Sequence, residues 1–367
     1  DQNGSVTATE YDDAGKVISV QDNDKNSVYY EYDAVGNIVK EIGKTGAVTS
    51  KTYDSAGNVL TVKDDNGNIT AYQYDNMNRV IKVTDALSGV TTYTYNNAGD
   101  LISSKNALGD IVSYTYDAYG NKLTETDANG NKTTYTYDAN NNLLTVKDAL
   151  NNITTYTYDS RNLLISVKNA VNQTVSYTYD ALGRKISVTD AKGNTTYMSY
   201  DGVGNVLTVT DAKGNIISST EYNELNLPET VTTAGGNITE YQYNKIGKTD
   251  TVTDSLNNRQ LYWYDNNGNN IKVMDASDNI STATYDVLGN VTSLTGPLGG
   301  TTQYTYDKLG RLISETTASG GTVSYGYNAL NLKSQLTNAK GQLRTYTYDA
   351  AGRITGYTSA EGSAAYT

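Results

Sequence analysis

Residues 131–183 read NKTTYTYDANNNLLTVKDALNNITTYTYDSRNLLISVKNAVNQTVSYTYDALG. The motif Tyr-Thr-Tyr-Asp occurs three times in this stretch, at Tyr135–Asp138, Tyr156–Asp159 and Tyr177–Asp180, and the copies lie 21 residues apart. Each copy is followed by a short gap that ends in Gly or Asn, and then by a run of aliphatic residues. Self-similarity at a fixed period is the sequence signature of a repeat protein, so the period decides the architecture.

The same unit runs through the whole chain. If each unit is numbered from the residue after its last Tyr, those Tyr stand at 11, 32, 53, 74, 95, 116, 137, 158, 179, 200, 222, 243, 264, 285, 306, 327 and 348. Every interval is 21 residues except the one from Tyr200 to Tyr222, which is 22. A length of 367 residues would suggest two or three domains, but repeat chains have no natural domain size. We predict one continuous array over residues 1–367, with about 17 units.

The first four positions of the unit predict a tight turn. Position 1 is Asp or Asn in all units, and position 4 is Gly or Asn. Gly and Asn tolerate positive φ, and an Asp side chain at position 1 can accept backbone N–H groups of the same turn. The residues that represent this predicted structural turn are Gly15, Gly36, Gly57, Gly99, Gly120, Gly183, Gly204, Asp138, Asp159 and Asp180.

The rest of the unit predicts two strands and a second turn. Positions 5–10, as in residues 58–63, are apolar mainly at 7 and 9, an alternation that indicates a strand with one buried face. Positions 11–14 form the second turn, and positions 15–21, as in residues 131–137, form the second strand with its two Tyr on one face. The extra residue before Tyr222 predicts a β-bulge. With Pro228 close behind it, residues 215–230 are expected to be irregular.

This pattern predicts an all-β protein, an antiparallel β-hairpin ribbon. About 34 strands at a spacing of about 4.8 Å would make a sheet of about 160 Å, and twisted open sheets of more than about ten strands curl or split. We therefore expect the ribbon to coil into a shell, a tube or a filament-like superhelix. Five units lack the first Tyr and are candidate seams of the array, at Thr9, Lys51, Met198, Thr220 and Ala283.

Composition excludes several function classes. The net charge of −12 argues against nucleic-acid binding, and no run of 18 apolar residues could span a membrane. The chain has neither His nor Cys, which excludes Ser-His-Asp, Cys-His and His-based metal sites. The 34 Tyr and the absence of Phe favour amphipathic surfaces over a thick apolar core.

The remaining candidates for chemistry have simpler structural explanations. Glu229 and Asp250 occupy the same position of neighbouring units, so they are expected about 10 Å apart, which is too far for a glycosidase pair. Asx-turns explain the Asp-rich turns, for which weak calcium binding is the only cofactor interaction left open. Trp263 occupies a position that is normally polar, so it is the candidate surface contact. The Tyr ladders could stack on sugars, although a structural role explains them more simply.

The residues at Tyr179–Thr195, Tyr306–Leu312 and Tyr348–Ile354 follow the pattern Tyr-Asp-x-x-Gly-Arg-x-Ile/Leu, and the array resembles the Rhs/YD-repeat family. The resemblance covers essentially the whole chain. It implies a secreted or surface-displayed bacterial ribbon of the kind that forms hollow shells around toxin cargo, or that stands on the cell surface as in wall-associated proteins and teneurin-like shells. The Asp-Pro-x-Gly of the family's self-cleavage region is absent, as is a divergent toxin-like C-terminal segment.

The sequence therefore predicts a non-enzymatic extracellular structural repeat protein, serving as shell wall, surface stalk or filament subunit. One alternative is an adhesive module that binds a glycan or a partner cell. Another is an encapsulation-shell segment of a polymorphic toxin. The expected partners are copies of the chain itself or the rest of a longer chain, of which this sequence is expected to be a piece. The expected location is secreted or at the bacterial cell surface.

Overall fold

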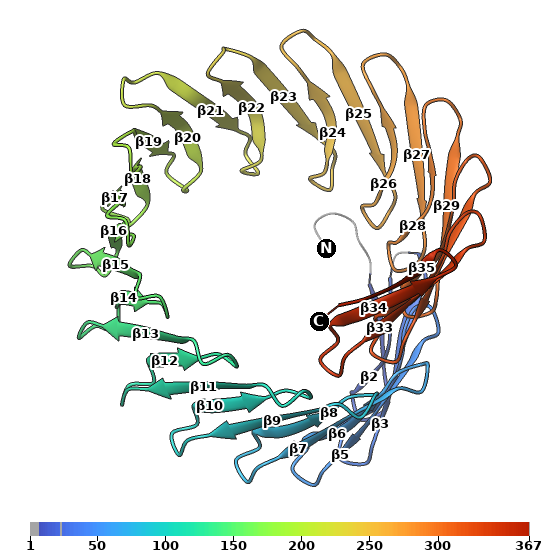
Figure 1. Ribbon diagram of the computed structural model, residues 1–367. Helices are drawn as coiled ribbons and strands as arrows, with labels where there is room; N and C mark the ends of the chain where they lie inside the picture. Colours follow the sequence, from blue (N-terminus) through green and yellow to red (C-terminus); the bar gives the residue numbers. More distant parts are fainter. Residues whose placement is uncertain (1–6, 23, 367) are drawn as a thin grey trace. The chain divides into compact units, whose positions relative to one another are not determined.

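The computed structural model describes residues 7–22 and 24–366, and it is all-β over those residues (Figure 1). The strands are β1 (Ala8–Tyr11), β2 (Val17–Gln21), β3 (Ser27–Tyr32), β4 (Ile38–Ile42), β5 (Val48–Tyr53), β6 (Val59–Lys63), β7 (Ile69–Tyr74), β8 (Val80–Thr84), β9 (Val90–Tyr95), β10 (Leu101–Lys105), β11 (Ile111–Tyr116), β12 (Lys122–Thr126), β13 (Lys132–Tyr137), β14 (Leu143–Lys147), β15 (Ile153–Tyr158), β16 (Leu164–Lys168), β17 (Thr174–Tyr179), β18 (Lys185–Thr189), β19 (Thr195–Tyr200), β20 (Val206–Thr210), β21 (Ile216–Tyr222), β22 (Pro228–Thr233), β23 (Ile238–Tyr243), β24 (Thr249–Thr253), β25 (Arg259–Tyr264), β26 (Asn270–Met274), β27 (Ile280–Tyr285), β28 (Val291–Thr295), β29 (Thr301–Tyr306), β30 (Leu312–Thr316), β31 (Thr322–Tyr327), β32 (Lys333–Thr337), β33 (Leu343–Tyr348), β34 (Ile354–Ser359) and β35 (Gly362–Ala365).

Neighbouring strands pair in antiparallel order. This holds along the runs β1–β9, β11–β24 and β25–β35, in which each strand pairs with the next. The 35 strands belong to one sheet. The predicted fold class, an all-β ribbon of antiparallel hairpins, is confirmed. The C-terminal hairpin β34–β35 departs from the unit, because only a short turn separates its two strands.

A regular bulge at position 7 recurs in the hairpins from β1 to β8 and from β11 to β34. Between β13 and β14, Thr136 lies opposite Thr145 and Tyr137 opposite Leu143, so Leu144 has no partner in the ladder. Positions 6 and 9, rather than 7 and 9 as the alternation suggested, therefore lie opposite the two Tyr. A bulge of this kind leaves one residue unpaired and adds twist to the strand pair.

The ribbon is one layer thick and has no apolar core. None of the described apolar side chains is buried, and the buried polar residues are Ser19, Ser187 and Thr251. These three hold position 8, where alcohol side chains pair across strands, as Thr178 does with Ser187 at 2.6 Å. The sheet is thus held together mainly by its backbone ladder and by contacts between side chains on the same face.

Contacts divide the chain into two large compact parts. We call them the first unit and the second unit, as distinct from the 21-residue repeat units. The first contains Asp1–Tyr93, Lys105–Asp110 and Leu261–Thr367, and the second contains Thr94–Ser104 and Ile111–Gln260. The first unit therefore joins two stretches that are far apart in the sequence. The second unit is the ribbon from about β10 to about β24.

In the second unit, the 22-residue repeat contains an additional bulge. Val209 lies opposite Ser218 and Thr210 opposite Ile216, so Ile217 is the extra residue. Pro228 does not disturb the strand that it begins: it lies opposite Tyr222 in β22, and its carbonyl oxygen accepts a hydrogen bond from the Tyr243 hydroxyl at 2.5 Å. Within residues 215–230, the departure from the common register is therefore the bulge at Ile217.

Candidate functional site

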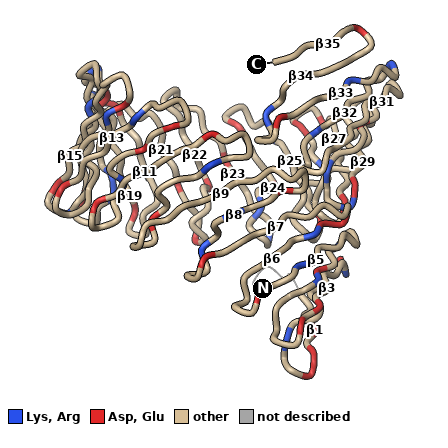
Figure 2. Tube along the Cα trace, turned by 60° about the horizontal axis from the view of Figure 1, so that its bottom comes forward, with Lys and Arg blue, Asp and Glu red and all other residues tan. Residues whose placement is uncertain are grey.

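Most turns of both kinds share one hydrogen-bonding scheme. At Asp138, the Oδ1 atom accepts the backbone N–H groups of Asn140 and Asn142, both at 2.9 Å, and Oδ2 accepts the Asn142 side-chain amide at 2.9 Å. Asp159 and Asp180 accept the corresponding N–H groups of their turns, and Asp127 does so in the second turn of its unit. Many of the acidic residues lie at such turns (Figure 2).

These hydrogen bonds shift the titration of the turn carboxylates. The Asn142 side chain, followed by the backbone N–H groups of Asn142 and Asn140, lowers the pKa of Asp138 below its ordinary value. Because both carboxylate oxygens already accept hydrogen bonds, these Asp serve the turn. In the described part of the chain, no three Asp or Glu residues are grouped as a metal site would require.

Position 4 adopts a left-handed backbone in every described unit. The φ angles are +80° at Gly15, +102° at Gly36, +86° at Gly57, +102° at Gly99, +84° at Gly120, +80° at Gly183 and +108° at Gly204. Where Asn replaces Gly, φ stays positive, as at Asn141 with +66°. L-residues with a Cβ rarely adopt this region, and Asn does so more readily than most.

In most described repeats, the hydroxyl of the second Tyr bonds to a backbone carbonyl oxygen of the same repeat. The hydroxyl of Tyr158 donates a hydrogen bond to the Leu143 carbonyl oxygen, 15 residues earlier, at 3.0 Å. Burial against the sheet raises the pKa of this hydroxyl. The same bond to the position 6 carbonyl is made by Tyr32, Tyr53, Tyr74, Tyr116, Tyr137, Tyr179, Tyr200, Tyr222, Tyr243, Tyr285, Tyr306, Tyr327 and Tyr348.

Cationic side chains cover several Tyr rings. The Lys122 ammonium lies 4.8 Å from the ring centre of Tyr135 and 5.7 Å from that of Tyr114, and it pairs with Glu125 at 2.6 Å. Lys185 lies in the same way 4.2 Å from the ring centre of Tyr177. Glu125 is one of the acids that replace the usual apolar residue at position 9. Its role here is to balance the charge of Lys122.

Trp263 is a half-exposed side chain with a cation over it. It lies opposite Lys272 in the β25–β26 ladder, and the Lys272 ammonium is 4.3 Å from its ring centre. The Trp side chain is 38% exposed. The structure therefore places this candidate surface contact in a cation–π pair across two strands.

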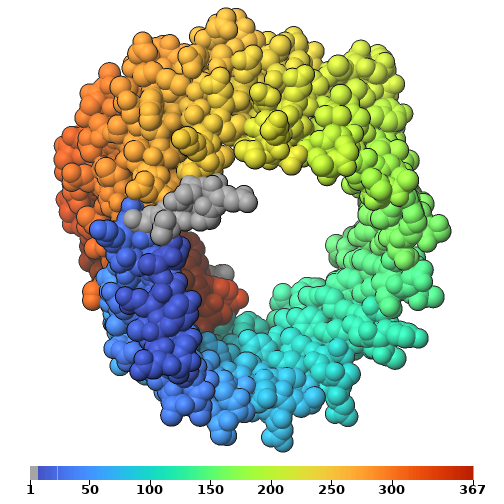
Figure 3. All heavy atoms as spheres, turned by 180° about the vertical axis from the view of Figure 1, so that it is seen from behind, coloured from blue at the N-terminus to red at the C-terminus, as the bar shows by residue number. Residues whose placement is uncertain are grey.

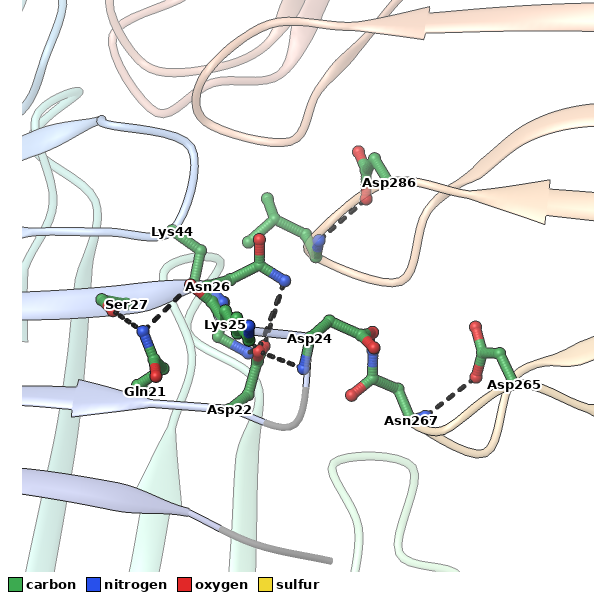
Figure 4. Close-up of polar contacts among 11 residues, drawn as sticks. Gln21, Asp22, Asp24, Lys25, Asn26, Ser27, Lys44, Asp265, Asn267 and Asp286 are labelled. Atoms are coloured by element: carbon green, nitrogen blue, oxygen red, sulfur yellow. Dashed lines mark hydrogen bonds and ion pairs between the residues drawn. The ribbon is translucent and has the colours of Figure 1, made fainter.

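A long-range contact zone, which we call the seam, lies within the first unit. The Thr45 hydroxyl donates a hydrogen bond to the Lys308 carbonyl oxygen at 2.6 Å, and the Lys308 ammonium lies 3.7 Å from an Asp65 carboxylate oxygen. Asn267 donates a side-chain hydrogen bond to Asp24 (Figure 4). The N-terminal strands lie beside the C-terminal strands of this unit (Figure 3).

The seam always joins a second turn to a first turn. Asp24, Thr45 and Asp65 belong to second turns, whereas Asn267 and Lys308 belong to first turns. We call the row of second turns along the ribbon the second-turn rim, and the row of first turns the first-turn rim. In the first unit, the second-turn rim near the N-terminal end meets the first-turn rim near the C-terminal end.

Close approach continues along the seam at its other end. A Cβ added to Gly89 would lie 3.2 Å from the Ala350 carbonyl oxygen, so the two backbones are close together. A cavity of about 480 Å³ lies beside them, lined in part by Asn106, Leu330 and Ala351. The contacts of this seam come from turns. The suggestion that the units without a first Tyr are seams of the array stays a prediction.

Apolar side chains at the tips of the turns are less exposed near the seam than in the second unit. On the second-turn rim, Leu87 is 53% and Leu108 is 40% exposed, whereas Leu150 in the second unit is 82% exposed. On the first-turn rim, Leu288 is 47% exposed, whereas Leu182 in the second unit is 75% exposed. Sequence reasoning missed these tips, because an apolar residue in the middle of a turn has no periodic signal.

Comparisons with known proteins identify the repeat. The family model for Teneurin YD-shell matches residues 4–174, and the model for RHS Repeat matches residues 158–195, 186–216, 285–322, 306–343 and 327–364. None of the curated proteins compared matches the sequence. No helix in the described part of the chain has the length and hydropathy of a membrane span.

Solved structures show the same fold. The crystal structure of TcdB2-TccC3-TEV is similar over 98% of this chain, with a TM-score of 0.80 and 17% identity, and the match covers 24% of that protein. The Photorhabdus luminescens Tc holotoxin pore is similar over 96% of this chain, with a TM-score of 0.53 and 18% identity, and the match covers 26% of that protein. This chain thus spans about a quarter of the length of each. It belongs to the Rhs/YD-repeat family.

Proposed function

We propose that this chain is a non-enzymatic wall segment of a YD-repeat shell, in a secreted or surface-displayed protein. The observation that carries this proposal is the seam of the first unit. A stalk made of a straight ribbon would keep its two rims apart along its length. Here, Asp65 and Lys308 bring a second turn and a first turn together from distant parts of the sequence. A ribbon whose rims meet in this way makes a continuous wall.

The chemistry of the wall supports a structural role. The turn carboxylates accept hydrogen bonds from backbone N–H groups, as Asp138 does. Glu125 is paired with Lys122, and the second Tyr of most units is bound to a backbone carbonyl oxygen, as Tyr158 is. The polar groups that would otherwise be candidates for catalysis thus stabilise the sheet. One of the similar solved structures is a holotoxin pore by name, which makes enclosure of a cargo the finer form of this proposal.

A disulfide across the seam tests the proposal, because the natural chain has no Cys. In the variant Thr45→Cys/Lys308→Cys, oxidation should produce an intramolecular disulfide that changes mobility on a non-reducing gel and raises Tm. The matched control is Val35→Cys/Lys308→Cys, in which both cysteines lie on the first-turn rim of the first unit. Val35 is 84% exposed, so this control should stay reduced. If the seam variant oxidises no faster than the control, the proposal that the two rims meet in a continuous wall is wrong.

A further inference from the structure

In the second unit, both rims expose large apolar side chains at the tips of their turns. In the second unit, the second-turn rim exposes Leu150 (82%), Val171 (71%) and Leu256 (79%). The first-turn rim of the same unit exposes Tyr119 (84%), Leu182 (75%) and Leu225 (71%). Leu150 and Val171 hold the tips of consecutive second turns. Leu182, Val203 (75% exposed) and Leu225 hold the tips of three consecutive first turns. Neighbouring apolar tips exposed to this extent indicate a surface that has a partner.

The seam shows what kind of partner fits these rims. It is the same row of turns, continued into the first unit, and there second turns meet first turns of the same ribbon, as Asp65 and Lys308 do. In this part of the ribbon, Leu108 on the second-turn rim is 40% exposed and Leu288 on the first-turn rim is 47% exposed. Because the turns of both units have the same hydrogen-bonding scheme, as Asp64 and Asp148 show, the open tips present the same shape as the covered ones.

We infer that the open rims of the second unit dock a second copy of this chain, with the second-turn rim of one copy against the first-turn rim of the next. This inference rests on the proposed function, since it takes the seam as the pattern for the contact between copies. The two rims differ in sequence, so the contact is heterologous. A heterologous contact that does not close on itself builds open stacks, which makes the protein a wall that extends by adding whole copies.

The contact should depend on the apolar tips and tolerate salt. Covering an apolar surface removes it from water, and this contribution is not screened by ions. The ion pair that accompanies the tips in the seam, between Lys308 and Asp65, is at 3.7 Å and its Lys side chain is 62% exposed. Such a pair contributes little to stability.

Two variants with opposite rims blocked provide the test. Variant S replaces the second-turn tips, Leu150→Lys/Val171→Lys/Leu256→Lys, and variant F replaces the first-turn tips, Tyr119→Lys/Leu182→Lys/Leu225→Lys. Sedimentation velocity of the chain 1–367 without substitutions should show species that grow with concentration. Each variant alone should sediment as a monomer, with self-association weakened by about tenfold or more.

The mixture of the two variants gives the decisive result. Variant S keeps an intact first-turn rim, and variant F keeps an intact second-turn rim. An equimolar mixture should therefore form a dimer of one S and one F chain, and this dimer has no intact rim left for further growth. The inference is overturned if the natural chain is monomeric at all concentrations, if either variant still dimerises alone, or if the mixture stays monomeric. The disulfide of Thr45→Cys/Lys308→Cys forms within one chain. It therefore tests the proposed wall independently of the contact between copies that the mixture tests.

Discussion

The hydroxyl of Tyr158 and the carbonyl oxygen of Leu143 are joined by a hydrogen bond of 3.0 Å. These two residues are the last residue and the sixth residue of one repeat, so the bond spans the unit. Tyr156, two residues earlier on the same strand, makes no hydroxyl hydrogen bond to the described residues. The two Tyr of a unit, which look alike in sequence, therefore have different roles.

Removal of the Tyr158 hydroxyl should destabilise the chain. Tyr158→Phe keeps the ring and leaves the Leu143 carbonyl without its side-chain donor, and we expect the free energy of unfolding to fall by about 1 kcal/mol. Tyr156→Phe is the matched control and should stay within about 0.5 kcal/mol of the natural chain. Urea denaturation followed by circular dichroism measures both. Equal losses in the two variants would show that the hydroxyl bond contributes nothing specific.

The protein should lose stability in alkali. Burial raises the pKa of Tyr158, and likewise of Tyr137 and Tyr179, above the ordinary value of 10.0. The unfolded chain therefore releases these protons at a lower pH than the folded chain. Stability is fully present below about pH 10 and falls as the pH rises further. Thermal melts across this range, with tyrosinate absorbance as a second signal, should show a steep drop in Tm. A flat profile would mean that these Tyr hydroxyls are not buried in the folded chain.

The protein should also lose stability in acid, for the opposite reason. Hydrogen bonds from the turn lower the pKa of Asp138 below 3.8, and similar bonds act on Asp127 and Asp148. The unfolded chain then binds protons at a higher pH than the folded chain, so stability is present above about pH 4 and falls below it. Tm measured against pH should decline on this side.

A variant with Asn at the same turns separates this effect from general acid damage. Asn223 shows that an amide oxygen serves the turn, since its Oδ1 accepts the N–H of Leu225 at 2.9 Å. Asp127→Asn/Asp138→Asn/Asp148→Asn should fold and should have a shallower acid decline. An identical decline in the natural chain and the variant would place the acid sensitivity elsewhere.

One turn contains a matched pair of glycines for testing the left-handed position. Gly204 has φ of +108°, whereas Gly202 has no positive φ, and a Cβ would meet no atom within 4 Å at either residue. Gly204→Ala should therefore lower the free energy of unfolding by about 1 kcal/mol. Gly202→Ala should be neutral or slightly stabilising, because it restricts the unfolded chain. Denaturant midpoints give the comparison, and a loss in both variants would point to crowding that the structure does not contain.

Much of the fold follows from the sequence because its determinants are local. Residues 131–137 were expected as a strand, and the structure has Lys132–Tyr137. Alternation and turn chemistry act within a few residues, so one repeat is enough to reveal them. The bulge at Leu144 escaped notice because the sequence there alternates as an unbroken strand would. Lys122, whose ammonium lies over the Tyr135 ring, stands next to the equivalent bulge at Leu123, so this stacking could not be predicted either.

The seam could not be derived from the repeat. Asp24 and Asn267 are 243 residues apart, and nothing in either turn differs from turns that have no partner. Their meeting depends on the accumulated twist of all the strands between them. Small errors in the twist of each strand pair add up over such a distance, so a local pattern does not determine which turns meet.

The single-layer ladder has a consequence for how such a chain can change its length. Each unit pairs only with its neighbours, so a duplication or deletion of one whole 21-residue unit would leave every ladder bond intact. It would only change which tip faces Lys308, replacing Asp65 by the corresponding residue of an adjacent unit. A gene that recombines with its own repeats could thus lengthen or shorten the ribbon in whole steps. The size of the wall could then vary between related proteins, and only the seam contacts would have to be compatible with each new length.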